Sequence, residues 1–355
     1  MKIRTGLMVL SLASPLAIML TTVARAPLKM RLRVKSFAAL LLVMSCVASA
    51  LAVRLPAQGQ EAPPPWAYVM NPPDFKPSPD DGSLRRVPDS SAAFTLTQLR
   101  DLFFAPDWHP GDHPPMPQIV ALGRKPDVFA CGVCHRADGP GGPENAGMSG
   151  LPKAYIMQQM ADFKSGARKT SLPERVPSKL MSSLSKAATD AEVEAAAEYF
   201  SALKPKAIMR VIETDTVPKT YVTGWHLAAT KTGEKEPIGQ RIIEVPEDLE
   251  RFVSRDARSR FIAYVPIGSI QNGQALASSG GKTVQCGICH GPDLKGLGSI
   301  PGIAGRSPSY IVRQLYDFKH GARAGAGSAL MKPSVEKLTV DDMLSLAAYA
   351  ASLSP

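Results

Sequence analysis

Hydrophobic residues recur with helical spacing in two stretches of the chain that lie far apart. Between Tyr155 and Gly166 they return at i, i+4 and i+7, which is the spacing of one face of an amphipathic helix. The stretch from Tyr310 to Gly321 repeats this spacing. A glycine closes each stretch, as is common where a helix ends. The pattern predicts two equivalent amphipathic helices.

Two alanine-rich hydrophobic runs, at 193–203 and 343–353, predict a second pair of helices. A threonine with an acidic residue three positions later precedes each run, and this pair forms a capping box at a helix N-terminus. The pairs are Thr189 with Glu192, and Thr339 with Asp342, whose shorter side chain makes the second box less regular. Each helical region is therefore expected to end in a capped helix.

The stretch 207–265 has a different pattern. It contains short runs rich in β-branched and aromatic residues that are separated by turn-forming residues, which is typical of strands. The runs are Met209–Ile212, Tyr221–Ala228, Arg241–Val245 and Phe261–Val265. We expect a small β-rich insert between the two helical regions. This insert would fix the relative placement of the two regions or dock a partner.

Residues 1–54 contain no acidic residue and hold two apolar stretches on either side of a basic cluster. The second stretch, 36–53, ends in small residues suited to signal peptidase, so it predicts a signal peptide. We expect translation to start at Met30, which opens this signal peptide. An uncleaved anchor is the alternative, because 18 uncharged residues just suffice to span a bilayer. Cys46 lies in this segment and is expected to leave with it.

The following stretch, 55–117, contains 14 of the 32 prolines and predicts an extended, irregular arm. One helix is expected in it, from Ser91 to Phe104. His109, His113 and Met116 lie close together in the sequence, where they would form a copper site, supply a haem ligand or have no metal role. Three such residues in a proline-rich loop are weak grounds for a metal site.

Every cysteine outside the N-terminal segment belongs to a C-x-x-C-H motif. The motifs are Cys131-Gly132-Val133-Cys134-His135 and Cys286-Gly287-Ile288-Cys289-His290. Two thiols one helical turn apart can bond to the two vinyl groups of haem, and the adjacent histidine then reaches the iron. A zinc site needs four ligands in one place, and a redox dithiol needs a βαβ context, so neither alternative fits. We predict two covalently bound haem c groups.

The similarity between the two halves extends beyond the motifs. Residues of the first half recur 155 positions later, including Tyr155-Ile156 at Tyr310-Ile311 and Asp162-Phe163-Lys164 at Asp317-Phe318-Lys319. A fixed offset over many positions indicates a duplicated domain.

A methionine is the expected sixth ligand of each iron, because a soft thioether favours the ferrous state. Met148, Met157 and Met160 of the first half have no methionine as counterpart. Only Met181 has one, Met331, when the terminal helices are aligned. We therefore predict His135 with Met181 and His290 with Met331 as axial ligands. Packing alone is the alternative role of these two methionines.

On these motifs, each half resembles a class I c-type cytochrome domain, and the pair resembles exported dihaem cytochromes. The resemblance covers 118–205 and 267–355 and implies a mainly α fold, with the distal methionine in a loop between later helices. The expected organisation is a targeting segment 1–52, a Pro-rich arm 53–117, a first cytochrome c domain 118–205, a β-rich insert 206–266 and a second cytochrome c domain 267–355.

The two halves differ where the resemblance implies a proline-containing support for the proximal histidine. Pro301 fits this support in the second half, whereas Ala146 stands in its place in the first. The resemblance thus implies a less secure backbone acceptor for His135, and different reduction potentials for the two haems. His226 in the insert is a further candidate for a distal ligand, although a core or surface role is the more common one for such a histidine.

Electron transfer is the expected function, since two six-coordinate haems leave no open position for a substrate. The alternatives are a haem-bearing subunit of a larger dehydrogenase complex and, less favoured, a dihaem peroxidase. Basic residues would steer an acidic partner or form a solvated helix face. They are Lys164, Arg168, Lys169, Lys319 and Arg323.

Composition agrees with an exported globular carrier. With 45% hydrophobic and 20% charged residues, the chain is neither disordered nor a polytopic membrane protein. The formal charge of +10 indicates nucleic-acid binding only at first sight, because residues 1–52 hold seven basic and no acidic residues. The remainder is nearly neutral, at +3, so we expect redox protein partners in the bacterial periplasm, no nucleic acid, and membrane contact only if the N-terminal segment is retained.

Overall fold

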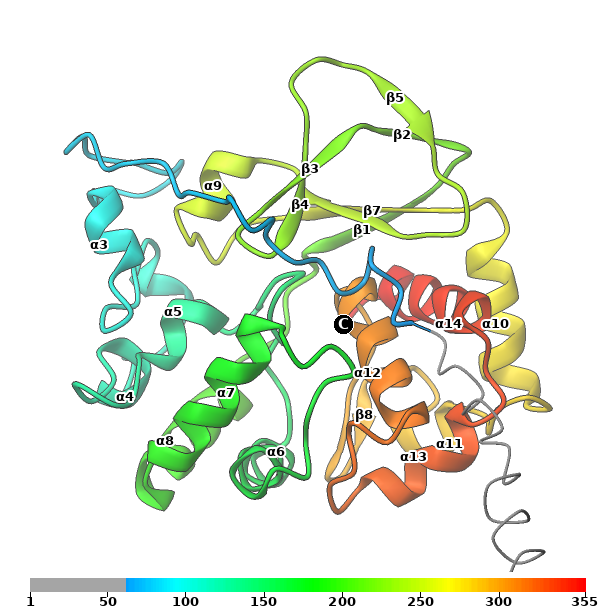
Figure 1. Cartoon of the computed structure of the whole chain (residues 1–355). Coiled ribbons are helices and arrows are strands. Elements are labelled where there is room, and N and C mark those ends of the chain that lie inside the picture. Colours follow the sequence, from blue (N-terminus) through cyan, green and yellow to red (C-terminus); the bar gives the residue numbers. More distant parts are fainter. Residues whose placement is uncertain (1–61) are drawn as a thin grey trace, which may run out of the picture. The chain divides into compact units, whose positions relative to one another are not determined.

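Residues 62–355 are described by the structure, a computed structural model, and from Pro63 onwards they form one compact unit. The expected signal segment and Cys46 lie outside the described residues. The chain is rich in helices and has a smaller number of strands (Figure 1). Within residues 62–355, no helix combines the length and hydrophobicity needed to cross a bilayer.

The first unit, which we define as residues 118–205, folds into five helices. Helix α8 begins after Thr189, and both hydrogen bonds of the predicted capping box are present. Helix α6 ends at Gly166, which has the left-handed φ of 77° that the glycine stop requires. The helices are α4 (Gln118–Ala121), α5 (Cys131–His135), α6 (Lys153–Ser165), α7 (Val176–Ala187) and α8 (Asp190–Ala202).

The second unit, residues 267–355, repeats this order and adds a short β-ladder. Asp342 closes its capping box with Thr339 as completely as Glu192 does in the first unit. Its helices are α10 (Ser269–Ser279), α11 (Gly287–His290), α12 (Pro308–Lys319), α13 (Ser328–Val335) and α14 (Val340–Ser352), and its strands are β8 (Gly296–Leu297) and β9 (Ile300–Pro301).

The insert, residues 206–266, carries the remaining strands. Its main sheet has the order β1-β7-β6, with β1 parallel and β6 antiparallel to β7. The elements are β1 (Met209–Glu213), β2 (Thr216–Pro218), β3 (Thr220–Thr223), β4 (His226–Ala229), β5 (Lys235–Pro237), β6 (Ile243–Pro246), α9 (Leu249–Val253) and β7 (Phe261–Val265). Buried side chains of this sheet join the hydrophobic core of the second unit, which therefore continues into the insert.

One predicted strand is wrong. The run from Tyr221 to Ala228 is a hairpin, because Gly224 and Trp225 take positive φ values of 54° and 64° and reverse the chain between β3 and β4. A two-residue turn with both φ values positive matches the twist of the paired strands. The glycine was the only signal of this turn in the sequence.

The helix predicted from Ser91 to Phe104 is much shorter than expected. Phe94 instead forms a β-bridge with Arg85, and Thr95 caps a helix that covers only α3 (Leu96–Arg100). Because the backbone N–H and C=O of Phe94 bond to Arg85, Phe94 does not join the helix. A 3-10 helix, η1 (Pro110–Asp112), follows in the same arm, residues 53–117.

The described part of the arm packs against the insert and the second unit. The Trp108 indole, only 3% exposed, donates to the Ser254 carbonyl of the insert at 2.7 Å. The Tyr68 hydroxyl donates to Asp317 in the second unit at 2.7 Å. Burial and this carboxylate raise the pKa of the Tyr68 phenol far above its usual range, so it stays protonated as a donor.

Helices α10 and α14 cross at Gly273, whose missing side chain permits their close approach. A Cβ at this position would overlap the Ser345 carbonyl oxygen and lie 2.8 Å from the Tyr349 Cβ. We expect Gly273→Ala to separate the helices and to lower the free energy of unfolding by about 1–3 kcal/mol. Urea unfolding of the holoprotein measures this loss.

The matched control is Gly327→Ala at the N-cap of α13, where φ is −81° and a Cβ meets open space. Equal stability of the two variants would contradict a packing role for Gly273.

Candidate haem sites

The first motif lies on helix α5, so that both thiols and the histidine come from a single helical turn. The His135 ring is 8% exposed, and its Nδ1 lies 2.8 Å from the Ala146 carbonyl oxygen. This acceptor assigns the proton to Nδ1 and leaves the lone pair of Nε2 available to a metal. Burial lowers the pKa of His135, which keeps the imidazole in the neutral form that a metal requires.

The second motif has the same local geometry. Cys286 precedes α11, which contains Cys289 and His290, and the His290 Nδ1 lies 2.8 Å from the Pro301 carbonyl oxygen. Strand β9 places this carbonyl, because Pro301 pairs with Gly296 of β8. Burial lowers the pKa of His290 as it does for His135.

The expectation of a weaker support for His135 is wrong. The two histidine-to-carbonyl distances are equal although Ala146 stands in the place of Pro301. The acceptor is a main-chain oxygen, so the path of the loop decides the contact and the side chain does not. The missing proline therefore gives no reason for different haem potentials.

A cavity of about 770 Å³ adjoins the first motif. Cys131, Cys134, His135 and Met181 all line it. Two thiols, an imidazole and a thioether at one largely apolar cavity are a donor set that fits covalent haem with an axial methionine. Met148 and Met160 line the same cavity, whereas Met157 packs against the core of the first unit.

Both predicted methionine ligands lie on helices and not in loops as the resemblance implied. Met181 is in α7 and Met331 in α13. Pro177 opens α7 within its first turn, and Pro333 lies inside α13. A proline fits the first turn of a helix, which explains how a segment expected as a loop can continue α7. Met331 is partly buried against the core of the second unit.

Arg168 and Arg323, which were expected to steer a partner from the surface, instead join the two units. Arg168 donates to the Tyr310 hydroxyl at 2.9 Å, and Arg323 donates to the Tyr155 hydroxyl at 2.7 Å. The duplicated sequence thus forms a pseudo-symmetric junction in which each arginine binds the other unit. The backbones pair at the same place. This contact needed the tertiary structure, since both residues read as a solvated helix face in the sequence.

A third buried guanidinium lies at this junction. Arg313 lies over the Tyr310 ring, at 5.6 Å from its centroid. Buried charges are costly unless they have polar partners. Arg313 has such partners, because it donates to the Ala67 carbonyl at 2.7 Å and to the Pro143 carbonyl at 2.6 Å.

Arg306 connects the two loops that orient the histidines. It donates to the Gly302 carbonyl at 2.6 Å and to the Gly147 carbonyl at 2.7 Å. Gly302 follows Pro301 and Gly147 follows Ala146 in the sequence, so one guanidinium binds next to both histidine acceptors. The counterpart of Arg306 in the first unit is Leu151, and this break in the repeat was the only sequence signal for it.

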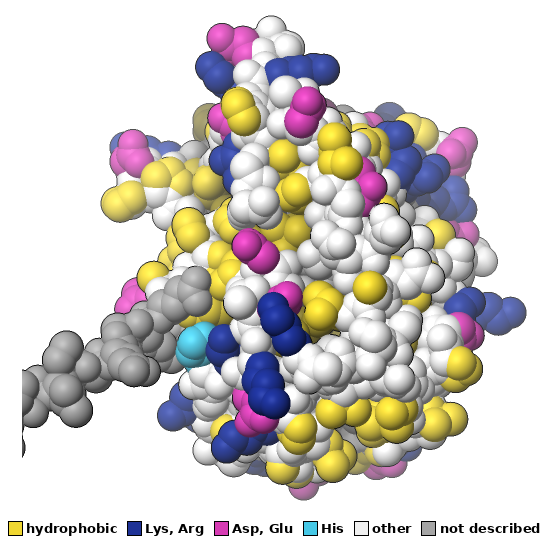
Figure 2. All heavy atoms as spheres, turned by 90° about the vertical axis from the view of Figure 1, so that its right-hand side faces the viewer, with side chains coloured by type: hydrophobic (Ala, Val, Ile, Leu, Met, Phe, Trp, Pro, Cys, Tyr) yellow, Lys and Arg dark blue, Asp and Glu magenta, His cyan; other side chains and the backbone are white. Residues whose placement is uncertain are grey.

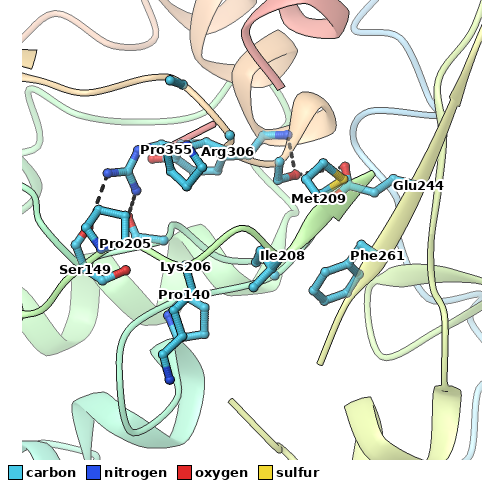
Figure 3. Close-up of a pocket in the computed structure, with 16 residues that line it drawn as sticks. Pro140, Ser149, Pro205, Lys206, Ile208, Met209, Glu244, Phe261, Arg306 and Pro355 are labelled. Carbon is cyan, nitrogen blue, oxygen red and sulfur yellow. Dashed lines mark hydrogen bonds between the residues drawn. The ribbon is translucent and has the colours of Figure 1, made fainter. Parts of the chain in front are cut away.

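A cavity of about 30 Å³ lies at the same junction. Arg306, Lys206 and Glu244 line it, and the Oε1 atom of buried Glu244 has no hydrogen-bond partner among the described residues (Figure 3). The volume is sufficient for a water molecule. Burial raises the pKa of Glu244, while its other oxygen accepts from Ser307 and Ser309.

The histidines considered as metal ligands outside the motifs have other partners. His109 Nε2 lies 3.1 Å from Asp256, and His113 contacts Asp107 and the Tyr199 hydroxyl. Among the described residues, no group of three or more His, Cys, Asp or Glu side chains has the arrangement of a metal site.

His226 lies at the wall of the first cavity, where its ring packs edge-on against Phe252 at 4.5 Å between ring centroids. Burial lowers its pKa. Its Nδ1 lies 3.3 Å from the Gly224 carbonyl oxygen, whereas its Nε2 has no hydrogen-bond partner among the described residues, so the distal-ligand role of His226 stays a prediction.

Comparisons with known proteins find similar cytochromes and electron acceptors. The thiosulfate dehydrogenase electron acceptor of Thiomonas intermedia is 28% identical over 65% of this chain and 82% of that protein. Cytochrome c4 of Azotobacter vinelandii is 24% identical over 63% of this chain and 84% of its own length. Cytochrome c-554(548) of Halomonas halodenitrificans is 37% identical over 19% of this chain and 82% of its own length. No family model matches the chain.

Two C-x-x-C-H helices with carbonyl-bound histidines define a protein that holds haem covalently. The chain belongs to the class I c-type cytochrome family. It binds two haem c groups and is an electron carrier, not an enzyme.

We expect replacement of Arg306 by leucine, its counterpart in the first unit, to destabilise both histidine loops. Each lost hydrogen bond from a charged donor costs about 1.5–3 kcal/mol, and the carbonyls of Gly147 and Gly302 lose their partner. Denaturant unfolding should show a lower midpoint, and both haem spectra should change together. A spectral change confined to one haem would contradict a shared role.

Proposed function

We propose that the protein is an exported dihaem cytochrome that passes single electrons between redox proteins through two His/Met-ligated haems. The observation that carries the proposal is the cavity at the first motif, which both His135 and Met181 line. The repeat extends the same ligand set to His290 and Met331. Bound haem supplies a ferric/ferrous couple, and a thioether ligand favours its reduced form.

The residues of this chain would hold and insulate that couple. His135 and His290 are fixed through Nδ1 by backbone carbonyls, so their rings keep one orientation during redox cycling. Apolar residues around the cavity of the first motif exclude water, which lowers the reorganisation that accompanies a change of charge. The two units meet through Arg168, Arg323 and Arg306, which favours exchange of electrons within one molecule.

Export to the bacterial periplasm is part of the proposal. Its support is the basic and apolar composition of residues 30–53, followed by a chain whose four cysteines are all assigned to haem attachment. Retention of this segment would add a membrane anchor. The expected domain boundaries, 53–117, 118–205, 206–266 and 267–355, belong to the proposal as well.

A dehydrogenase is the proposed electron donor. The relative from Thiomonas intermedia bears the name of an electron acceptor of thiosulfate dehydrogenase, and its similarity covers most of that protein. We favour a carrier that dissociates from its dehydrogenase. The alternative is a haem-bearing subunit that stays bound to its dehydrogenase, with the arm and the insert as binding surfaces.

Met181→Ala and Met331→Ala test the ligation. Each change should remove the long-wavelength sulfur-to-iron band of one oxidised haem, so the band of the intact protein should fall to about half. Absorption spectra of the purified holoprotein in both oxidation states measure this. Met148→Ala and Met160→Ala are the matched controls, because both residues line the same cavity.

Loss of the band in a control variant in place of Met181→Ala would reassign the ligand. High-spin features or binding of carbon monoxide by the reduced intact protein would overturn the carrier with two saturated irons.

A further inference from the structure

The arm and the insert cover the first haem motif but leave the second exposed. Val133, the third residue of the first motif, is fully buried, whereas its counterpart Ile288 is 63% exposed. Cys289 is also exposed. Hydrophobic side chains gather on the lower part of the face in Figure 2, at the level where Figure 1 shows α11 and α13. The duplicated motifs therefore have different surroundings.

Arg255 of the insert is the closest link between the cover and the first motif. Its guanidinium donates to the Val133 carbonyl and to the Leu99 carbonyl of the arm, both at 2.6 Å. Burial and the field of Arg136 lower the pKa of Arg255 to about 10, which leaves it charged at neutral pH. A full positive charge is thus held against the peptide that joins the two haem-bearing cysteines.

Arg136, which follows the proximal histidine, adds a second buried charge. It is 3% exposed, donates to the Val133 carbonyl at 3.3 Å and lies 3.4 Å from the Glu144 carboxylate. It also lies 3.4 Å from the Cys134 carbonyl oxygen, so Arg136 and Arg255 both contact the backbone of the motif.

Positive charges outnumber negative ones around the first motif. Glu144 is the carboxylate nearest to the two arginines, and its backbone carbonyl accepts from a third guanidinium, that of Arg175, at 3.0 Å. Glu192, whose field reaches Cys131, is itself paired with Arg124 at 2.7 Å.

The second motif lacks this arrangement. The counterpart of Arg136 is Gly291, and the counterpart of Glu144 is Ser299. Arg255, which contacts the backbone of the first motif, belongs to the insert, and the repeat therefore offers no counterpart of it.

We propose that the positive charges of Arg255 and Arg136 raise the reduction potential of the first haem above that of the second. The insert holds Arg255 against the first haem-binding motif. A ferric haem carries one more positive charge than a ferrous haem. Nearby buried cations destabilise the ferric form, and low local polarity strengthens this effect. Electrons therefore rest on the covered first haem, and the exposed second haem exchanges them with partners.

The fold holds Arg255 firmly in this place. Its neighbour Ser254 accepts the Trp108 indole, and Asp256, which is fully buried, binds His109 of the arm and Arg251. Arg258 makes two bonds to Asp112 of the arm, at 2.7 and 2.8 Å. The arm and the insert are thus joined on both sides of Arg255, which keeps its guanidinium in place.

The test is a spectroscopic redox titration of the full-length holoprotein, and it rests on the proposed function. Arg255→Gln should lower the midpoint potential of one haem, which Met181→Ala and Met331→Ala in the same background identify as the first. Arg255→Lys keeps the charge and should stay closer to the wild type. Arg260→Gln removes an equal charge from an exposed site of the same insert and should shift neither haem.

Two further variants give the sign of the effect. Arg136→Gly copies the second unit and suits the positive φ of 69° at this position, so the first haem should again shift downwards without backbone strain. Glu144→Gln removes the opposing charge and should shift it upwards. Because these changes lie outside the insert, they keep the test valid if Arg255→Gln folds poorly.

Equal shifts of both haems, or the same shift in Arg255→Gln and Arg255→Lys, would overturn the proposal. A downward shift in Glu144→Gln would do so as well. If the intact protein lacked two low-spin haems, the proposed function itself would fail. If it had both haems and the arginine variants left their potentials unchanged, only the inference on Arg255 and Arg136 would fail.

Discussion

The hydrogen bond from each proximal histidine to a main-chain carbonyl is the contact on which the rest of the structure depends. The distance from Nδ1 to the carbonyl oxygen is 2.8 Å in both units. This contact selects the tautomer, fixes the ring and leaves the lone pair of Nε2 available to a metal. The loop that carries the carbonyl must therefore be held in place. Arg306 does this for both loops at once, because it binds Gly147 and Gly302 beside the two acceptors. One side chain thus links the proximal sides of the two haem sites.

Duplication supplied two equivalent haem sites, and the parts outside the repeat make them unequal. The sheet of the insert extends the core of the second unit, so the insert is anchored there. From this base it reaches the first motif through Arg255, together with the arm. The insert packs on the second unit and places the positive charge of Arg255 against the first motif. Identical cofactors thereby have different surroundings.

The haem chemistry and most helices could be predicted because they depend on neighbours in the sequence. A C-x-x-C-H motif is complete within one helical turn, and the capping boxes at Thr189 and Thr339 are local as well. The predictions that were wrong involved contacts of low sequence specificity. Phe94 left its predicted helix for a bridge to Arg85, and Arg168 and Arg323 turned from the surface to the junction.

The sequence by itself determined the cofactor and the duplication, since each depends on residues that are close together in the chain or recur at a fixed offset. Only the tertiary structure decided which loop carbonyl meets each histidine, where the arginines gather and which motif is covered. Those features depend on main-chain oxygens and on charges from distant segments. Any residue can supply a carbonyl, and an arginine has no fixed partner, so folding alone assigns them.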